Sequence, residues 1–489
     1  MTQFEQLGPR RMSPRLRLVA PGEAINAPPS PRPARPARRS HPVSATLTGL
    51  DLDGGFSLLM FLLLLFSLQL GTLGAALLSL VILAYGAAMW RRLWSVLAPR
   101  AFLLVVPGFA VLSVFWSQAP GDSAKFALEF VLTVLAGLLL SAAKNPHAVF
   151  RGMATAFFIY VCAAIAFGHQ TAVGAYGDQA FSGLSDGKNL LADIAATGLL
   201  LSLGVAVHAL QHSRPSWALA GFFAALVQFY AVAAAHSAGA LLGLGFGLIA
   251  LAGLLAVYRA GMGLRAILVG FLCVCLVVGA ASYEWLSTQL IELGADLFDK
   301  DPTLTGRTYL WYRADQLIAE RPLLGRGFYA FWLQGDTDAE GLWRYAGITS
   351  RGGFSFHNTG VEILVQLGWL GLVTVLLTVL IGLGLLLRRF VLRPNLALCI
   401  WMSILLYELV RTPIEAVGMA PFYFSTILTF AALAAALGSS QHEASPEPES
   451  DDRRSSRRRS PRAPDRSHRL LEPATVPTRR LLAPPVEQP

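Results

Sequence analysis

The stretch Gly368–Leu387, GWLGLVTVLLTVLIGLGLLL, contains no charged residue and is followed directly by Arg388 and Arg389. A helix needs about 20 apolar residues to cross the hydrocarbon core of a bilayer, and this stretch alone is long enough. It lies within a longer apolar run, 359–387. The run therefore predicts a membrane-spanning helix that ends in a basic loop.

Similar apolar runs fill the chain on both sides of this stretch, and we expect about twelve spans in all. The runs are 56–70, 72–90, 101–117, 125–142, 149–168, 189–209, 215–234, 237–256, 264–282, 359–387, 395–411 and 417–437. The first two form one apolar stretch interrupted by Gln69, Gly71 and Gly74, which fits either a tight hairpin or one long tilted helix. The predicted fold is all-α, a polytopic bundle of about 12 transmembrane helices with one large outer loop.

The composition supports a membrane protein and argues against a soluble one. The chain has 489 residues, of which 54% are hydrophobic and only 14% charged, whereas about a quarter of an average soluble domain is charged. The net charge of +9 lies largely in the two ends and in short loops. A nucleic-acid-binding protein would carry a basic folded face instead, so nucleic acid is not an expected partner.

The ends of the chain differ in composition from the apolar part. Residues 1–52 and 438–489 are rich in Pro and Arg, and such segments cannot bury enough apolar surface to fold. We expect both to be disordered cytoplasmic tails, with contact to anionic lipid head groups as a further possibility. Residues 53–437 are expected to form one transmembrane domain, with a periplasmic loop at 283–356.

The orientation follows from the basic residues in the short loops, because cytoplasmic loops carry an excess of Lys and Arg. One alternating set of loops is poor in them. The other set holds Arg91, Arg92, Arg100, Lys144, Arg214, Arg259, Arg265, Arg388, Arg389 and Arg393. This pattern predicts cytoplasmic termini and an even number of spans.

The long loop 283–356 is the only large polar segment between spans, and long loops are often functional. Leu310, Ala314, Leu317 and Ile318 have helical spacing, so we expect a short amphipathic helix that Thr305 caps and Pro322 ends.

Charged and polar residues at the outer ends of the spans are the candidate site residues. His357 precedes the span at 359–387; histidine exchanges protons near neutral pH, and a helix N-terminus favours an anion. Lys188 begins the span at 189–209, and Arg411 ends the span at 395–411. Such residues are costly in a membrane and tend to be functional.

Structural roles remain open for each of these residues. His357 also fits a simple interfacial residue, and Lys188 a snorkelling anchor. Glu408 and Arg411 have the spacing of a helical ion pair, and Asp193 is placed to pair with Lys188. The four cysteines all lie in apolar runs without the usual ligand spacings, so no metal site is expected.

Several motifs in order resemble those of the O-antigen ligase and O-antigen polymerase superfamily, which includes proteins of exopolysaccharide production. They are Gly306-Arg307-Thr308 with Trp311, Arg321-Pro322-Leu323-Leu324-Gly325-Arg326-Gly327-Phe328, His357-Asn358, and Gly368-Trp369-Leu370-Gly371. The resemblance covers residues 283–387 well, and Gly187-Lys188-Asn189 and the number of spans extend it.

The resemblance implies a GT-C-like membrane glycosyltransferase of the bacterial inner membrane. It would transfer a glycan from undecaprenyl diphosphate to a sugar hydroxyl, with inversion and without a metal or cofactor. His357 then resembles the base, and Arg307 a diphosphate contact. Lys188, Asn358 and Trp311 are further candidates for substrate binding, and Arg411 is added from its position in the topology.

The chain departs from the family pattern at one point. His236-Ser237-Ala238-Gly239 has Ala238 where the family has a cation beside the serine, so His236 is a candidate replacement.

We expect a polymerase that joins lipid-linked repeat units, with membrane lipids and other polysaccharide assembly and export proteins as partners. The alternatives are a ligase that moves finished glycan to a lipid A core or another acceptor, and a transporter or flippase.

Overall fold

The computed structural model describes residues 51–173, 178–281, 307–351 and 353–437. The two expected tails lie outside these residues except at Asp51 and Leu52. Residues 283–306 of the expected outer loop, including Thr305, also lie outside them.

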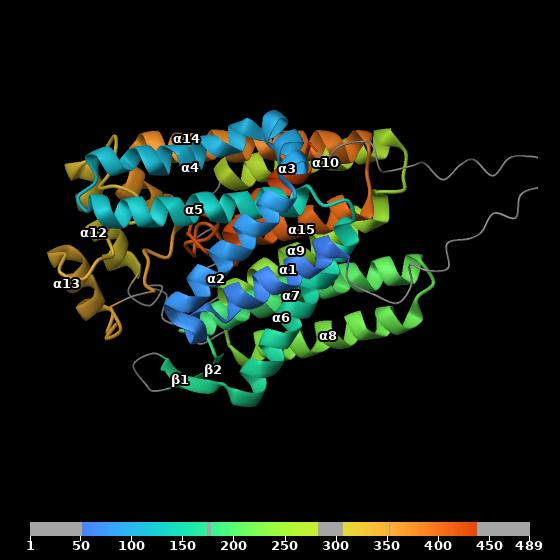
Figure 1. Ribbon diagram of the computed structural model, residues 1–489, viewed down its shortest axis with the longest axis horizontal. Helices are drawn as coiled ribbons and strands as arrows, with labels where there is room; N and C mark the ends of the chain where they lie inside the picture. The colour runs from blue at the N-terminus through green and yellow to red at the C-terminus, as the bar shows by residue number, and fades with distance from the viewer. Residues whose placement is uncertain (1–50, 174–177, 282–306, 352, 438–489) are drawn as a thin grey trace, which may run out of the picture. The chain divides into compact units, whose positions relative to one another are not determined.

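Most of the described chain is helical (Figure 1). In chain order the elements are α1 (Leu52–Leu65), α2 (Ser67–Ala88), α3 (Trp90–Leu97), η1 (Ala98–Leu104), α4 (Val105–Leu112), η2 (Ser113–Trp116), α5 (Pro120–Ser141), α6 (Pro146–Phe167), β1 (His169–Val173), β2 (Asp178–Gly183), α7 (Lys188–Gln211), α8 (Pro215–Ala234), α9 (Ala238–Val257), α10 (Met262–Ala281), α12 (Arg307–Glu320), α13 (Thr337–Tyr345), α14 (Thr359–Leu392), α15 (Leu396–Arg411) and α16 (Phe424–Ala435).

Each predicted apolar run contains a helix. Within the described residues, eight helical segments are long and apolar enough to cross a membrane: Ser67–Ala88, Ala98–Trp116, Pro120–Ser141, Pro146–Phe167, Lys188–Gln211, Pro215–Ala234, Ala238–Val257 and Thr359–Leu392. The helices in the other runs, such as α1 and α16, are shorter or have shorter apolar parts. A polytopic helical membrane protein is confirmed, and the number of about twelve crossings stays a prediction.

The ambiguity in the first apolar stretch is resolved in favour of a hairpin. α1 ends at Leu65 and α2 begins at Ser67. The ring of Phe56, near the start of α1, stacks on Tyr85, near the end of α2, with 3.8 Å between ring centroids. Helices whose opposite ends meet in this way run antiparallel.

The expectation of a purely α-helical chain is wrong at one place. β1 and β2 form an antiparallel hairpin between α6 and α7, with His169 opposite Gly183 and Thr171 opposite Ala180. The hairpin was not expected because its sequence is short and lacks a clear alternating pattern.

The loops that carry most of the basic residues meet at one end of the helices, called here the basic end. Asp53 accepts hydrogen bonds from Arg92 Nη1 at 2.8 Å and from the Lys144 backbone at 2.8 Å. Arg265 Nε donates to the Val391 carbonyl at 3.0 Å. The first two contacts join α1, α3 and the turn after α5, and the third joins α10 to the end of α14.

The opposite end, called here the site end, carries α12 and α13, which lie together beyond the ends of α4, α5 and α14 in Figure 1. Leu310, Ala314 and Leu317 of α12 are buried in a separate small core with Leu342 and Trp343 of α13. The predicted amphipathic helix is therefore confirmed, whereas α13 was not anticipated.

α14 is broken at Gly368, and the loop between α12 and α13 fills the break. The Trp369 and Leu370 backbone amides donate to the carbonyls of Pro322 and Leu323, at 2.8 and 3.1 Å. Gly368 has a φ of 65°, and a Cβ there would lie 2.4 Å from the Leu323 carbonyl carbon and oxygen. Only glycine tolerates both conditions, so this motif glycine joins the outer loop to the helix.

Candidate functional site

The first residues of α14 anchor the loop that follows α15. Asn358 caps α14, because its side-chain oxygen accepts from the Val361 amide at 3.1 Å, and its Nδ2 donates to the Pro413 carbonyl at 3.2 Å. The Thr359 hydroxyl donates to the Glu415 carbonyl at 2.9 Å and accepts from the Val417 amide at 2.9 Å. The predicted substrate residue Asn358 thus has a structural role in placing Glu415.

Glu415 lies at the centre of the candidate site, where three separate segments meet. Its Oε2 lies 3.0 Å from Nδ1 of His357. Its Oε1 accepts from Arg307 Nη2 at 3.0 Å and from Asn189 Nδ2 at 3.2 Å. Two of the predicted site residues, His357 and Arg307, are therefore brought together by a carboxylate that the sequence analysis did not single out.

The surroundings of Glu415 keep it ionised. Burial acts to raise the pKa of Glu415, but the hydrogen bond to His357 and the nearby positive charges of Arg307 and Arg411 act the other way and outweigh it. The pKa of Glu415 is lowered from 4.5 to about 2. The side chain of His357 is 24% exposed, so it can be reached from outside while held by the carboxylate.

Lys188 and His236 meet at the starts of α7 and α9. Lys188 Nζ lies 3.5 Å from the His236 carbonyl oxygen, a long contact. His236 is exposed and has a φ of 50° in the turn before α9. The Lys188 ammonium group therefore lies near Ala238, where the family pattern has a cation.

Three helices, α7, α9 and α14, begin near Glu415 and Lys188. Asn189, in the first turn of α7, bonds Glu415, and a Cβ on Gly239, in the first turn of α9, would lie 3.1 Å from Ile414. α14 begins at Thr359, which also bonds Glu415. Unpaired amides give each helix start a partial positive charge. The site end is therefore suited to an anion.

Arg411 has a different environment from the one expected for a substrate contact. Its side chain is 4% exposed and pairs with Asp193 on α7, and its Nη1 lies 3.5 Å from Glu408. Tyr407 and Tyr423 also donate hydrogen bonds to Asp193, at 2.7 and 3.2 Å. Arg411 thus joins α15 to α7 in a buried network.

The expected pairing of Asp193 with Lys188 is wrong. Asp193 lies more than one turn further along α7 and faces α15, where Arg411 neutralises it. The alternative of a structural Glu408–Arg411 pair fits the structure, with Asp193 as its third member.

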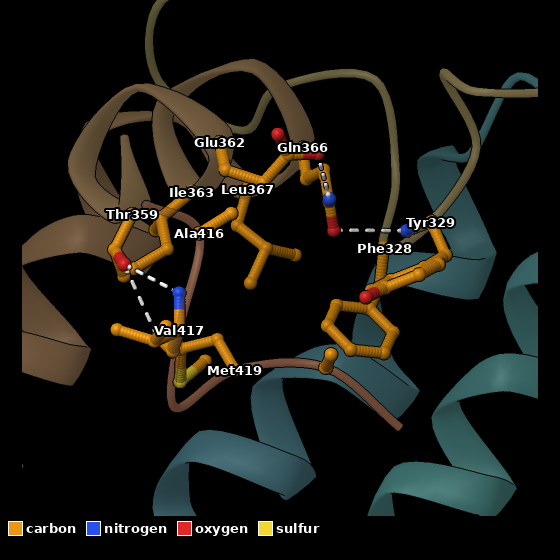
Figure 2. Close-up of a pocket in the computed structure, with 11 residues that line it drawn as sticks. Phe328, Tyr329, Thr359, Glu362, Ile363, Gln366, Leu367, Ala416, Val417 and Met419 are labelled. Atoms are coloured by element: carbon orange, nitrogen blue, oxygen red, sulfur yellow. Dashed lines mark hydrogen bonds between the residues drawn. The ribbon is translucent and has the colours of Figure 1, made fainter. Parts of the chain in front are cut away.

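Trp311 positions the segment before His357. Its indole Nε1 donates to the Phe356 carbonyl at 2.8 Å. A cavity of about 30 Å³ lies beside the first turns of α14 and is lined by Tyr329, Thr359, Glu362 and Gln366 among others (Figure 2). This volume holds about one water molecule, so a glycan must bind elsewhere.

The described residues include no group of three or more His, Cys, Asp or Glu side chains placed to hold a metal ion. The chemistry that they do offer is a histidine paired with a carboxylate, an arginine and a lysine nearby, and several helix starts. This set can move a proton and stabilise an anion.

Comparison with known proteins finds two similarities to this chain. Residues 223–376 match the family described as O-Antigen ligase. The matched region includes Arg307, Trp311, His357 and Asn358. The resemblance to the O-antigen ligase and polymerase superfamily is confirmed. The chain is also similar to the exopolysaccharide production protein ExoQ of Rhizobium meliloti (strain 1021), with 30% identity over 290 residues. The aligned part is 58% of this chain and spans 64% of the length of that relative.

Sequence reasoning missed Glu415 and Asn189 as members of the site. Asn189 stands beside Lys188 in the superfamily motif, and it is Asn189 that bonds Glu415. Glu415 follows Arg411-Thr412-Pro413 by two residues. An acidic residue in a short loop beside a helix end was the available signal.

Proposed function

We propose that this protein is a membrane glycosyltransferase that joins oligosaccharide repeat units, carried on undecaprenyl diphosphate, into exopolysaccharide or O-antigen. The observation that carries the proposal is the contact of Glu415 with both His357 and Arg307, at 3.0 Å in each case. Glu415 thus holds a proton acceptor, His357, next to a cation, Arg307. Sugar transfer from a diphosphate requires one group of each kind.

His357 is the proposed base. Glu415 holds Nδ1 of the imidazole and favours a proton there, which leaves Nε2 able to accept the proton of the acceptor hydroxyl. The hydroxyl oxygen then forms a bond to the anomeric carbon of the donor sugar. The bond from that carbon to the diphosphate oxygen breaks, and a single displacement inverts the configuration.

Arg307 and Lys188 are proposed to stabilise the departing undecaprenyl diphosphate. A guanidinium has five N–H donors, and in the described structure Arg307 uses two of its nitrogens to reach Glu415 and the Ile414 carbonyl. The starts of α7, α9 and α14 add partial positive charge. His236 lies at the same level and is a further candidate contact. These groups balance the anionic charge without requiring a metal ion.

The proposed topology places the basic end in the cytoplasm and the site end in the periplasm of a bacterial inner membrane. The excess of basic residues in the loops of the basic end supports this orientation. The periplasm holds no nucleotide sugars, so the donor there must be carried by a lipid. A diphosphate at the membrane surface fits a site at the ends of spanning helices.

Two alternatives remain, each with an observation in its favour. The matched family is described as O-Antigen ligase, which favours transfer of finished glycan to a lipid A core or another acceptor. A transporter would use broken helices to line a path, and α14 is broken at Gly368. However, the 322–327 backbone fills that break, which argues against a path at this point.

Analysis of glycolipids in a strain that lacks the protein distinguishes these functions. A polymerase predicts single repeat units on the lipid carrier, and a ligase predicts long polymer on the carrier. Normal glycolipids together with loss of a solute's uptake would indicate transport. The same strain carrying Arg307→Ala should accumulate the same lipid-linked species, because diphosphate stabilisation is lost.

A further inference from the structure

We propose that Glu362 is a positioning residue that fixes the backbone at His357 and thereby directs its imidazole. The inference rests on the proposed function of His357 as the base. Glu362 lies on the first turn of α14, and Figure 2 shows its side chain hydrogen-bonded to Gln366 on the next turn. Nothing in the family motifs points to this residue.

The backbone of His357 is in the left-handed region, with a φ of 51°. A residue with a Cβ rarely adopts this conformation, and it persists only where neighbouring residues enforce it. The direction of the imidazole depends on this conformation. The residues on either side of His357 must therefore be held firmly.

Phe356, which precedes His357, is held through both of its backbone polar groups. Its amide donates to Glu362 Oε2 at 2.9 Å, and its carbonyl accepts from Trp311 Nε1 at 2.8 Å. Its ring is fully buried and stacks on Phe331, with 5.3 Å between ring centroids. On the other side, Asn358 is fixed as the cap of α14.

Glu362 is chemically suited to this role because all three of its partners are donors. Besides the Phe356 amide, Trp332 Nε1 donates to its Oε1 at 3.0 Å and Gln366 Nε2 donates to the same atom at 2.8 Å. Gln366 Oε1 in turn accepts from the Tyr329 amide at 3.0 Å. The carboxylate thus connects α14 to both ends of the segment 329–356.

The substitution Glu362→Gln tests this role. An amide has one acceptor oxygen and one donor group, so at least one of the three donors would face an N–H group. We expect kcat for transfer from a lipid-linked donor to fall by about 10- to 100-fold, because a small misplacement of a reacting group has an effect of this size. The KM for the donor should be unchanged, since Arg307 and Lys188 do not contact Glu362.

A reciprocal exchange separates positioning from a general structural effect. In Glu362→Gln/Gln366→Glu, the amide oxygen at 362 can accept from Phe356, its Nε2 can donate to the new carboxylate, and that carboxylate can accept from Tyr329. Trp332 Nε1 still faces an N–H group, so we expect this double variant to recover part of the lost kcat. Trp311→Phe removes the donor to the Phe356 carbonyl and should lower kcat by the same factor. This variant replaces Glu362→Gln in the test if Glu362→Gln does not fold.

Asp53→Asn is a matched control at the basic end. Asp53 is also a buried carboxylate with three donors: Tyr85, Arg92 and the Lys144 amide. This variant should lower the melting temperature and leave kcat per folded molecule unchanged.

The measurements use the purified full chain in lipid nanodiscs with an undecaprenyl-diphosphate-linked repeat unit. A normal kcat in both Glu362→Gln and Trp311→Phe, a raised donor KM at constant kcat, or a double variant no better than Glu362→Gln would each overturn the inference. The proposed function fails separately, if wild-type protein transfers no sugar or if His357→Ala transfers it normally.

Discussion

Glu415 Oε2 lies 3.0 Å from Nδ1 of His357, although the two residues are 58 positions apart in the chain. The contact joins the start of α14 to the loop after α15. It gives the proposed base an anionic partner that fixes the tautomer and orientation of the imidazole. The same carboxylate also holds Arg307, so one side chain organises both halves of the proposed chemistry.

The first prediction concerns this carboxylate. Glu415→Gln should lower kcat by about 10- to 100-fold, because the imidazole loses its orienting charge. The variant also loses the charge contacts of Glu415 with Arg307 and His357, so its melting temperature should fall and kcat is compared per folded molecule. The measurement is transfer from a lipid-linked donor by purified protein. An unchanged kcat would show that Glu415 does not orient the proposed base.

The second prediction concerns pH. The pKa of Glu415 is lowered from 4.5 to about 2 by its partners. Its ionised form therefore stabilises the folded protein above pH 4.5, and this contribution, about 3 kcal/mol, is lost as the pH falls toward 2. The difference in melting temperature between wild type and Glu415→Gln should shrink over this range. A difference that is constant from pH 7 to pH 2 would contradict the lowered pKa.

The third prediction tests whether Arg411 has a structural role and does not contact the substrate. Arg411→Ala leaves Asp193 and Glu408 buried without their cation, and we expect destabilisation of about 3–5 kcal/mol. Adding Asp193→Asn and Glu408→Gln should restore part of the protein level in membranes. If Arg411→Ala were instead stable and accumulated lipid-linked donor, Arg411 would be a substrate contact after all.

The fourth prediction concerns the break in α14. Gly368→Ala should destabilise the protein by about 1–3 kcal/mol, because a Cβ at φ 65° is strained and would meet the Leu323 carbonyl. Gly384 lies in the same helix with open space around its Cβ position. Gly384→Ala should be neutral or slightly stabilising. Equal melting temperatures for the two variants would show that the break tolerates a side chain.

The apolar runs predicted the helices well because spanning segments must be apolar along their whole length. The run 72–90 corresponds to α2, and 189–209 to α7. The β1–β2 hairpin and α13 could not be predicted, because both are short elements in polar loops whose structure depends on tertiary packing. The charge pattern predicts which loops face the cytoplasm, and this orientation stays a prediction.

The site was predicted in part. Motif and position indicated His357 and Arg307, which do lie together. Arg411 and Asp193 were harder to assign, because sequence distance does not show which faces of α7 and α15 meet. Glu415 was missed because its importance depends on a tertiary contact between two distant helix ends.

The most direct test of the central claim is transfer of a lipid-linked repeat unit by purified protein in nanodiscs, followed by mass spectrometry of the glycolipid. We expect wild-type protein to form products with more than one repeat unit and to release undecaprenyl diphosphate. His357→Ala, folded and inserted, should slow this reaction by about 100-fold or more. Product formation at the wild-type rate in His357→Ala would contradict the assignment of His357 as the base.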